Sequence, residues 1–232
     1  PQGLHWCLAP PDTPTVRLGA DGHPIRDEDG LLPPIDLPRR MWASSKVDFI
    51  APLRIGESIE RRSRVAAITE KSGSTGRLAF VDIDHETWGK TGLAIRETQT
   101  LVYLEPSPAT AGPSNLAQTE PFKPDPGSIH RAITPDEPLL FRYSALTFNT
   151  HRIHYDAPYA TKVEGYRDLV VHGPLMATLL LDLARRHFGE QPLDQFAFRA
   201  RSPAVVGEAL HLTIDAQGSN LTLAVHANDA RE

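Results

Sequence analysis

One segment in the second half of the chain has a helical period that no other segment matches. It covers residues 172–190 and reads HGPLMATLLLDLARRHFGE. Pro174 suits the first turn of a helix, Gly189 suits its C-terminal cap, and the basic side chains at 185–187 lie where the helix dipole favours cations. The pattern predicts a buried helix over residues 174–188. Its wide apolar face consists of Leu175, Met176, Leu179, Leu180, Leu183 and Ala184.

Strand-like runs lie on both sides of this helix. Runs rich in β-branched and aromatic residues, separated by turn signals, predict an antiparallel meander in the first half of the chain. We predict these four strands at residues 41–49, 58–69, 78–88 and 93–103, with turns at 54–57, 71–76 and 89–92. In the second half we predict strands at residues 139–147, 195–201, 209–216 and 221–227.

A long apolar helix wrapped by one curved antiparallel sheet is the hot-dog arrangement. The first half has the same run of strands without a helix, so we expect an α+β double hot-dog fold whose missing helix lies upstream of Pro1. Residues 1–110 would form a degenerate N-terminal half with an extended arm. Residues 111–128, rich in proline and small residues, would be a linker, and residues 129–232 would form the C-terminal half.

Composition limits the class of protein. The 232 residues are 40 % hydrophobic and 23 % charged, which suits a globular protein, and a net charge of −5 argues against a nucleic-acid partner. No apolar run reaches the ~18–20 residues of a membrane span. The single cysteine, Cys7, excludes an internal disulfide framework and suits a reducing compartment, so we expect a cytoplasmic protein. The chain starts at Pro1 without a signal-like segment, so we expect its native start to lie elsewhere. A homo-oligomer is left open.

The densest polar cluster, TFNTHRIHYD at residues 147–156, directly precedes the predicted helix. Catalysis near neutral pH needs a titratable group, a partner that orients water and donors for oxyanion charge. His154, Asn149 and the backbone amide of Gly173 could supply these. The alternative is a surface loop with solvated histidines, which we would prefer for one histidine in isolation.

The same cluster also has the spacing of a metal site. His151 and His154 with Asp156 could bind zinc or iron. No fourth ligand or metalloprotease pattern accompanies them, and no glycine-rich phosphate loop is present. We therefore favour proton transfer and predict neither a metal nor another cofactor.

Residues 149–160 resemble the hydratase motif of the MaoC-like, R-specific enoyl-thioester hydratases. In that motif an Asp, an Asn-Pro pair and a His are followed by an Asp and an aromatic-Ala pair. His154 matches the catalytic His, Asp156 matches the Asp two residues later, and Tyr159 with Ala160 matches the aromatic-Ala pair.

The chain departs from the motif at two points, since Asn149 stands where the Asp is usual and HR at 151–152 replaces Asn-Pro. It is therefore similar to a subgroup, the double hot-dog branch of mesaconyl-C4-CoA hydratase, itaconyl-CoA hydratase and the mitochondrial 3-hydroxyacyl-thioester dehydratase. The resemblance spans nearly the whole chain. It is carried by the blocks DGHP at 21–24, LPRRMWA at 37–43, PLRIGE at 52–57, FNTHRIHYD at 148–156 and GYRDLVVHGP at 165–174.

The resemblance implies hydration of an α,β-unsaturated thioester. His154 would be the base, and the N–H of Gly173 with the helix dipole would stabilise the thioester oxygen. Asn149 cannot exchange a proton as Asp would, so it would hold the water or the substrate. The groups that could have taken over proton delivery are Asp156, Glu164 and His151.

We expect a lyase that hydrates an unsaturated C5-dicarboxylic acyl-CoA, mesaconyl-C4-CoA or itaconyl-CoA, to citramalyl-CoA. The carboxylate of such an acyl group would pair with an arginine, for which Arg40, Arg152 and Arg167 are candidates, although a surface role is the alternative for each. His172 is also a candidate, but its place just before the helix favours a buried position bonded to backbone. The further candidate substrate-binding residues are His151 and Tyr166.

Other functions remain open. Within the class, the alternative is dehydration of 3-hydroxyacyl thioesters in fatty-acid synthesis. From other classes, the alternatives are a hot-dog thioesterase and an inactive acyl-binding module. A hot-dog thioesterase usually needs a carboxylate on or beside the helix, and Asp182 lies too far along it for that role. We expect no active site in the first half, where His85 stands alone on a strand pattern.

Overall fold

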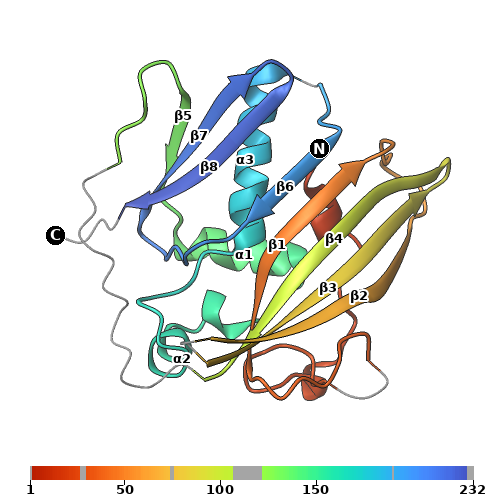
Figure 1. Cartoon of the computed structure of the whole chain (residues 1–232), viewed down its shortest axis with the longest axis vertical. Helices are drawn as coiled ribbons and strands as arrows, with labels where there is room; N and C mark the ends of the chain where they lie inside the picture. The colour runs from red at the N-terminus through yellow and green to blue at the C-terminus, as the bar shows by residue number, and fades with distance from the viewer. Residues whose placement is uncertain (1, 27–29, 74–75, 107–121, 190, 229–232) are drawn as a thin grey trace. The chain divides into compact units, whose positions relative to one another are not determined.

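The structure is a computed structural model that describes residues 2–26, 30–73, 76–106, 122–189 and 191–228. The chain divides into two compact units (Figure 1). The helix unit comprises Pro1–Pro24, Ser107–Pro192 and Ser202–Glu232, and the sheet unit comprises Ile25–Pro106 and Leu193–Arg201. Most of the predicted linker, residues 111–121, lies outside the described residues.

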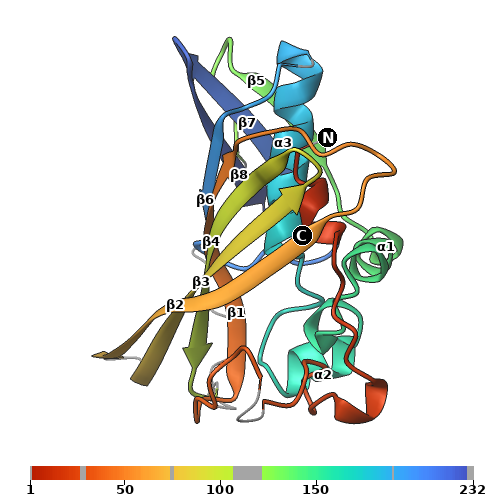
Figure 2. The same cartoon turned by 90° about the vertical axis from the view of Figure 1, so that its right-hand side faces the viewer.

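The sheet unit is one antiparallel sheet of long, twisted strands (Figure 2). Its order is β2-β3-β4-β1-β6. The four predicted strands are found with bounds shifted by a few residues, but only β2, β3 and β4 form a meander, because β1 pairs with β4 and not with β2. The strands are β1 Arg39–Phe49, β2 Glu60–Gly73, β3 Gly76–Gly89, β4 Gly92–Leu104 and β6 Gln195–Arg199. Residues 74–75 of the predicted turn lie outside the described part of the chain.

Strand β6 corrects the predicted organisation. Residues 195–201 were expected in the meander of the second half, but β6 pairs with β1, with Val47 opposite Phe196. The strand itself was predictable from its aromatic residues, whereas the partner was not, because pairing depends on contacts distant in sequence.

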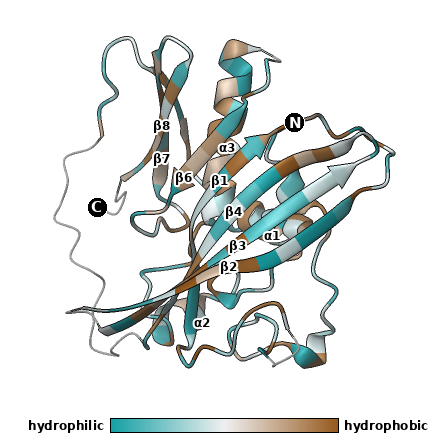
Figure 3. Cartoon of the chain, turned by 45° about the vertical axis from the view of Figure 1, so that its right-hand side comes forward, coloured by the Kyte–Doolittle hydropathy of each residue, from teal (hydrophilic) through white to brown (hydrophobic). Residues whose placement is uncertain are grey.

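Alternation of polar and apolar side chains explains why the sheet unit forms strands. Every second residue along much of β3 is buried, as the period of a strand requires. Figure 3 shows hydrophilic and hydrophobic residues mixed along these strands. Val81 and Ile83 join Leu101 and Tyr103 of β4 in a core that also includes Leu37. No long helix occurs among the described residues 30–106 of this unit.

The helix unit is built on the predicted helix, which is confirmed as α3, Gly173–Phe188. A second antiparallel sheet of order β5-β7-β8 belongs to the same unit. The apolar face of α3 packs with β7, where Leu180 and Leu183 contact a cluster containing Leu212 and Ile214. Each leucine so buried contributes on the order of 2 kcal/mol. The strands are β5 Ile129–Ile133, β7 Ala209–Gln217 and β8 Asn220–Asn228.

The strand predicted at residues 139–147 is wrong, because this segment is the helix α1, Glu137–Thr147. The Asp136 carboxylate accepts a hydrogen bond from the Leu139 backbone N–H at 2.9 Å, and Pro138 lies in the first turn. These are helix-start signals, and the strand pattern of the following residues masked them. Among the described residues, no helix is both long enough and apolar enough to cross a membrane.

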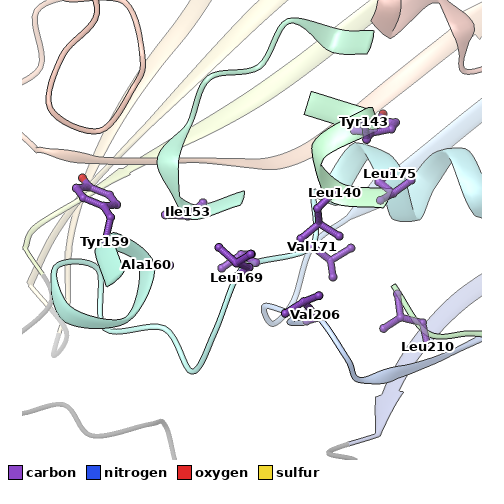
Figure 4. Close-up of a cluster of buried hydrophobic side chains, with 12 residues drawn as sticks. Leu140, Tyr143, Ile153, Tyr159, Ala160, Leu169, Val171, Leu175, Val206 and Leu210 are labelled. Atoms are coloured by element: carbon purple, nitrogen blue, oxygen red, sulfur yellow. The ribbon is translucent and has the colours of Figure 1, made fainter. Parts of the chain in front are cut away.

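The short elements of the helix unit are the 3₁₀ turns η1 Leu4–Cys7, η2 Thr15–Arg17 and η3 Arg152–His154, with the short helix α2 Ala157–Lys162. Of these, η3 and α2 share one hydrophobic core with α1 and α3 (Figure 4). Leu140 and Tyr143 of α1 pack with Ile153 of η3 and Leu175 of α3. This core holds the polar segment before α2 against the first turn of α3.

Candidate active site

The polar segment after α1 is held by its own turns. Phe148 adopts a left-handed conformation with φ 51° and ends α1. The Asn149 side-chain oxygen then accepts a hydrogen bond from the His151 backbone N–H at 3.0 Å. Asn149 therefore shapes the turn that presents His151 and η3.

His154 is a buried histidine, and one of its ring nitrogens is held by a hydrogen bond to the backbone. Its Nδ1 lies 2.7 Å from the Val170 carbonyl oxygen, which can only accept, so Nδ1 carries the proton and Nε2 holds the lone pair. Burial lowers the pKa of His154 to about 4, and the hydrogen bond to Val170 opposes this only in part. At neutral pH the ring is uncharged and Nε2 can act as a base.

His172 packs directly on this base. The two rings stack with centroids 3.6 Å apart, and His172 Nε2 lies 2.8 Å from Ser144 Oγ. Burial, together with the neighbouring His154, keeps the pKa of His172 far below its ordinary value. The predicted buried position is found, but the hydrogen-bond partner is a side chain of α1 and not the backbone.

Gly173 begins α3, and its surroundings are open. The preceding residue, His172, places no side-chain cap on the helix. A Cβ added at Gly173 would meet no described atom within 4 Å. The first N–H groups and the positive end of the dipole can thus approach a carbonyl oxygen.

The N-terminal segment docks onto the polar segment, which sequence reasoning did not foresee. The Arg152 backbone N–H donates to Asp21 O at 2.9 Å, and Thr150 Oγ1 donates to Gly22 O at 2.5 Å. Gly22 has φ 87°, and a Cβ there would lie 1.9 Å from Thr150 O. Only glycine allows this approach. The DGHP block at residues 21–24 was the available signal.

Docking brings an aspartate and a histidine to the cluster. Asp21 Oδ2 lies 2.8 Å from His23 Nδ1, and the His23 backbone N–H donates to Asp21 Oδ1 at 3.0 Å. The His23 ring lies 4.1 Å from the His151 ring, which meets the His154 ring edge-on at 5.6 Å. Burial would raise the pKa of Asp21, but the hydrogen bonds and charge of His23 outweigh it and lower the pKa well below its usual range.

Asp156 and Arg152 form a local clamp. Arg152 Nε and Nη2 donate to Asp156 Oδ2 at 3.0 and 2.7 Å, and Asp156 Oδ1 accepts from the Tyr159 backbone N–H at the start of α2. The hydrogen bond from Arg152 is the largest cause of the lowered pKa of Asp156. Arg152 Nη1 also donates to Ala20 O at 2.8 Å. These contacts hold both side chains in place at the start of α2, and their catalytic and substrate-binding roles stay predictions.

The three remaining candidates for substrate binding are Arg167, Tyr166 and Arg40. Arg167 Nη1 pairs with Glu208 Oε1, and both side chains are largely buried. Tyr166 is partly buried against the core of the helix unit. Arg40 lies on β1 in the sheet unit and is not part of the histidine cluster of the helix unit; no ion pair or side-chain hydrogen bond of Arg40 is found among the described residues.

In the part of the chain that the structure describes, the group with donor atoms close enough for a metal differs from the predicted set. It is Asp21, His23 and His151, with donor atoms within 4.8 Å of one another. The contact between His23 Nδ1 and Asp21 Oδ2 has hydrogen-bond length, so we interpret the two as a proton-sharing pair and not as metal ligands. Asp156, from the predicted set, is committed to Arg152.

Comparisons with known proteins identify the family of this chain. The family profile of hydroxyacyl-thioester dehydratase type 2 matches residues 3–206. The mesaconyl-C(4)-CoA hydratase of Chloroflexus aurantiacus is 46 % identical over 199 residues, which cover 86 % of this chain and 69 % of that protein.

Solved structures support the fold. A MaoC-like dehydratase superposes with a TM-score of 0.66 at 14 % identity, over 84 % of this chain and 73 % of the other. A Mycobacterium tuberculosis protein described as having a double hot-dog fold superposes with a TM-score of 0.55 at 13 % identity, over 84 % and 70 % of the two chains. The predicted α+β double hot-dog class is confirmed. The chain belongs to the hydroxyacyl-thioester dehydratase type 2 family, a group of MaoC-like hydratases and dehydratases.

Proposed function

We propose that this enzyme hydrates an unsaturated C5-dicarboxylic acyl-CoA, mesaconyl-C4-CoA or itaconyl-CoA, to citramalyl-CoA. The identity with the Chloroflexus hydratase supports acyl-CoA hydration. The observation that carries the chemistry is the buried, uncharged His154, whose Nδ1 is held by Val170.

For mesaconyl-C4-CoA, whose double bond is conjugated to the thioester, the reaction would proceed by addition of water across that bond. His154 Nε2 takes a proton from water, and the water oxygen bonds to the β-carbon. The π electrons move toward the thioester oxygen, where the Gly173 N–H and the start of α3 stabilise the enolate. A proton then bonds to the α-carbon and restores the thioester, so the product gains one water. We assign Asn149 to hold the water or the substrate.

Recognition of the second carboxylate requires a cation. Arg152 and Arg167 already pair with Asp156 and Glu208. Arg40, the third arginine that the sequence suggests for this carboxylate, has no ion-pair partner among the described residues, and its replacement tests that role.

The family match also favours a second candidate, dehydration of a 3-hydroxyacyl thioester. This is the reverse reaction in the same site, with His154 returning a proton to the leaving hydroxyl group. It differs from the first proposal in substrate, so relative turnover with simple and dicarboxylic acyl groups separates the two.

The test follows enoyl absorbance and free thiol together with mesaconyl-C4-CoA, itaconyl-CoA and crotonyl-CoA. We expect absorbance to fall without thiol release, fastest with mesaconyl-C4-CoA. His154→Gln should lower turnover by about 10²–10⁴-fold, as loss of a general base does. His187→Gln, at an exposed position near the end of α3, is the control. Thiol release would indicate a thioesterase, and binding without turnover would indicate an acyl-binding module.

A further inference from the structure

The hydration reaction needs two proton transfers, and the polar segment alone provides one clear group for them. His154 serves as the base, but Asn149 stands where a carboxylate is usual and cannot give up a proton. Of the substitutes suggested by the sequence, Asp156 is bound by Arg152 and by the α2 backbone. Glu164 is buried and lies 3.3 Å from the Tyr159 hydroxyl, which donates to it.

The docked N-terminal segment supplies a different acid–base pair beside His154. Asp21 and His23 are in hydrogen-bond contact at 2.8 Å, and their side chains are 20 % and 18 % exposed. His151 and His154 are buried, whereas His23 is partly exposed, so His23 is more open to a small molecule than these two histidines.

The position of this pair is fixed by backbone contacts. Hydrogen bonds link the Asp21 and Gly22 carbonyls to Arg152 and Thr150, two and four residues before His154. The close approach at Gly22 leaves no room for a side chain. Residues 21–23 are therefore held in a fixed position next to residues 150–154, which include His154. Proton transfer requires such fixed positions of the groups involved.

The pair also has suitable hydrogen-bond polarity. Because Asp21 faces His23 Nδ1, the carboxylate stabilises a proton there and leaves Nε2 as the donor to a substrate. The low pKa of Asp21 keeps its carboxylate ionised, which favours the imidazolium form of His23. The charge of His23 is also one of the causes that lower the pKa of His154. The two histidines therefore favour opposite protonation states.

We propose that His23, oriented by Asp21, is the second catalytic residue and delivers the proton to the α-carbon. The inference rests on the proposed hydration. His154 Nε2 takes one proton from water while the C–O bond forms, and His23 Nε2 gives one proton while the α C–H bond forms. The imidazolium of His154 then returns its proton to neutral His23, through His151 or solvent, and the cycle closes without an added reactant.

The experiment compares His23→Gln with the wild type on mesaconyl-C4-CoA. Glutamine keeps a polar side chain of similar reach but cannot transfer a proton. We expect kcat to fall by about 10²–10⁴-fold with KM changed less than about threefold. His23→Ala should recover part of its kcat when free imidazole is added. Asp12→Asn, an exposed change in the same segment, is the control and should leave kcat unchanged.

Asp21 is tested as a positioning residue by its effect on the pH profile. The titratable groups nearest His23 in the helix unit are Asp21, His151 and His154. Tyr159, whose pKa is affected by Asp21, and Arg152, which donates to Ala20 O, also face this segment. Without the carboxylate, His23 loses its proton more easily, so Asp21→Asn should move the alkaline limb of kcat to lower pH by about 1–3 units. A purely structural role would lower kcat at all pH values without moving the limb.

The outcomes separate this inference from the proposed function. If the wild type hydrates and His154→Gln does not, while folded His23→Gln keeps kcat within about threefold, the role of His23 is refuted and hydration stands. If the wild type hydrates none of the three thioesters, the proposed function itself fails. Loss of activity on dialysis against a chelator, with recovery on added Zn²⁺, would overturn the proton-transfer role in favour of a cation at Asp21, His23 and His151.

Discussion

At the residue scale, burial and one hydrogen bond determine the chemistry of His154. A solvated histidine near pH 7 is partly protonated, whereas His154 is held neutral because its cation would be desolvated. The bond to Val170 selects the tautomer and points Nε2 away from the backbone. In this environment the imidazole stays neutral over the physiological pH range, so Nε2 can accept a proton. No adjacent carboxylate is needed to set the tautomer, because the Val170 carbonyl already does so.

The same burial predicts acid sensitivity of the fold. The unfolded chain titrates His154 near the ordinary pKa of 6.5, and the folded chain near 4, so the unfolded state binds more protons between these values. We expect the free energy of unfolding to fall as pH drops from about 6.5 to 4, by about 3 kcal/mol for the full shift. His172 acts in the same direction.

Urea unfolding at pH 7.5, 6 and 5 measures this effect. His154→Gln should flatten the dependence on pH, and the exposed control His187→Gln should retain it. An equally steep loss of stability in His154→Gln and the wild type would show that His154 is not the responsible group.

What could be predicted at this scale rests on local signals. The buried helix follows from the sequence pattern and is found as α3, and the candidacy of His154 and Gly173 follows from the resemblance. Arg152 and Asp156 are four residues apart, a spacing at which opposite charges can pair, whereas the partner of Arg167, Glu208, is distant in sequence and no local pattern reveals it. Carboxylates near a motif can serve as caps just as well as acids, and only geometry distinguishes the two.

At the element scale, the informative error is α1. Its residues resemble a strand by composition, but Asp136 and Pro138 start a helix, and tertiary packing of Leu140 and Tyr143 stabilises it. The docking of residues 19–24 is a second feature of this kind. Glycine at position 22 indicates a special backbone conformation, yet the sequence does not show which segment approaches it.

Gly22→Ala tests the docking. A Cβ would lie 1.9 Å from Thr150 O, and φ is 87°, so we expect a loss of about 1–3 kcal/mol in stability and a fall in kcat of at least about tenfold. Gly56→Ala is the matched control, since it has the same φ of 87° and no described atom within 4 Å of the added carbon. Chemical unfolding and steady-state kinetics measure both. Wild-type kcat in Gly22→Ala would rule out a contribution of this docking to turnover.

At the scale of the whole molecule, the order of elements was largely predictable and their distribution between units was not. The first 24 residues belong to the helix unit, and residues 193–201 belong to the sheet unit, although the sequence suggested two consecutive halves. Periodicity identifies strands and helices locally. Exchange of segments between units is decided by long-range pairing, such as Val47 with Phe196.

The preference for a dicarboxylic over a simple acyl group depends on the whole chain, and replacement of Arg40 tests it. If its guanidinium pairs with the distal carboxylate, Arg40→Gln removes a charge-assisted hydrogen bond worth about 1.5–3 kcal/mol. The KM for mesaconyl-C4-CoA should then rise by about 10–100-fold, whereas crotonyl-CoA, which has no such carboxylate, should change by less than about threefold. Arg64→Gln, an exposed change on β2, is the control. Equal effects on both thioesters would assign Arg40 to CoA binding or folding and leave the dicarboxylate without its proposed partner.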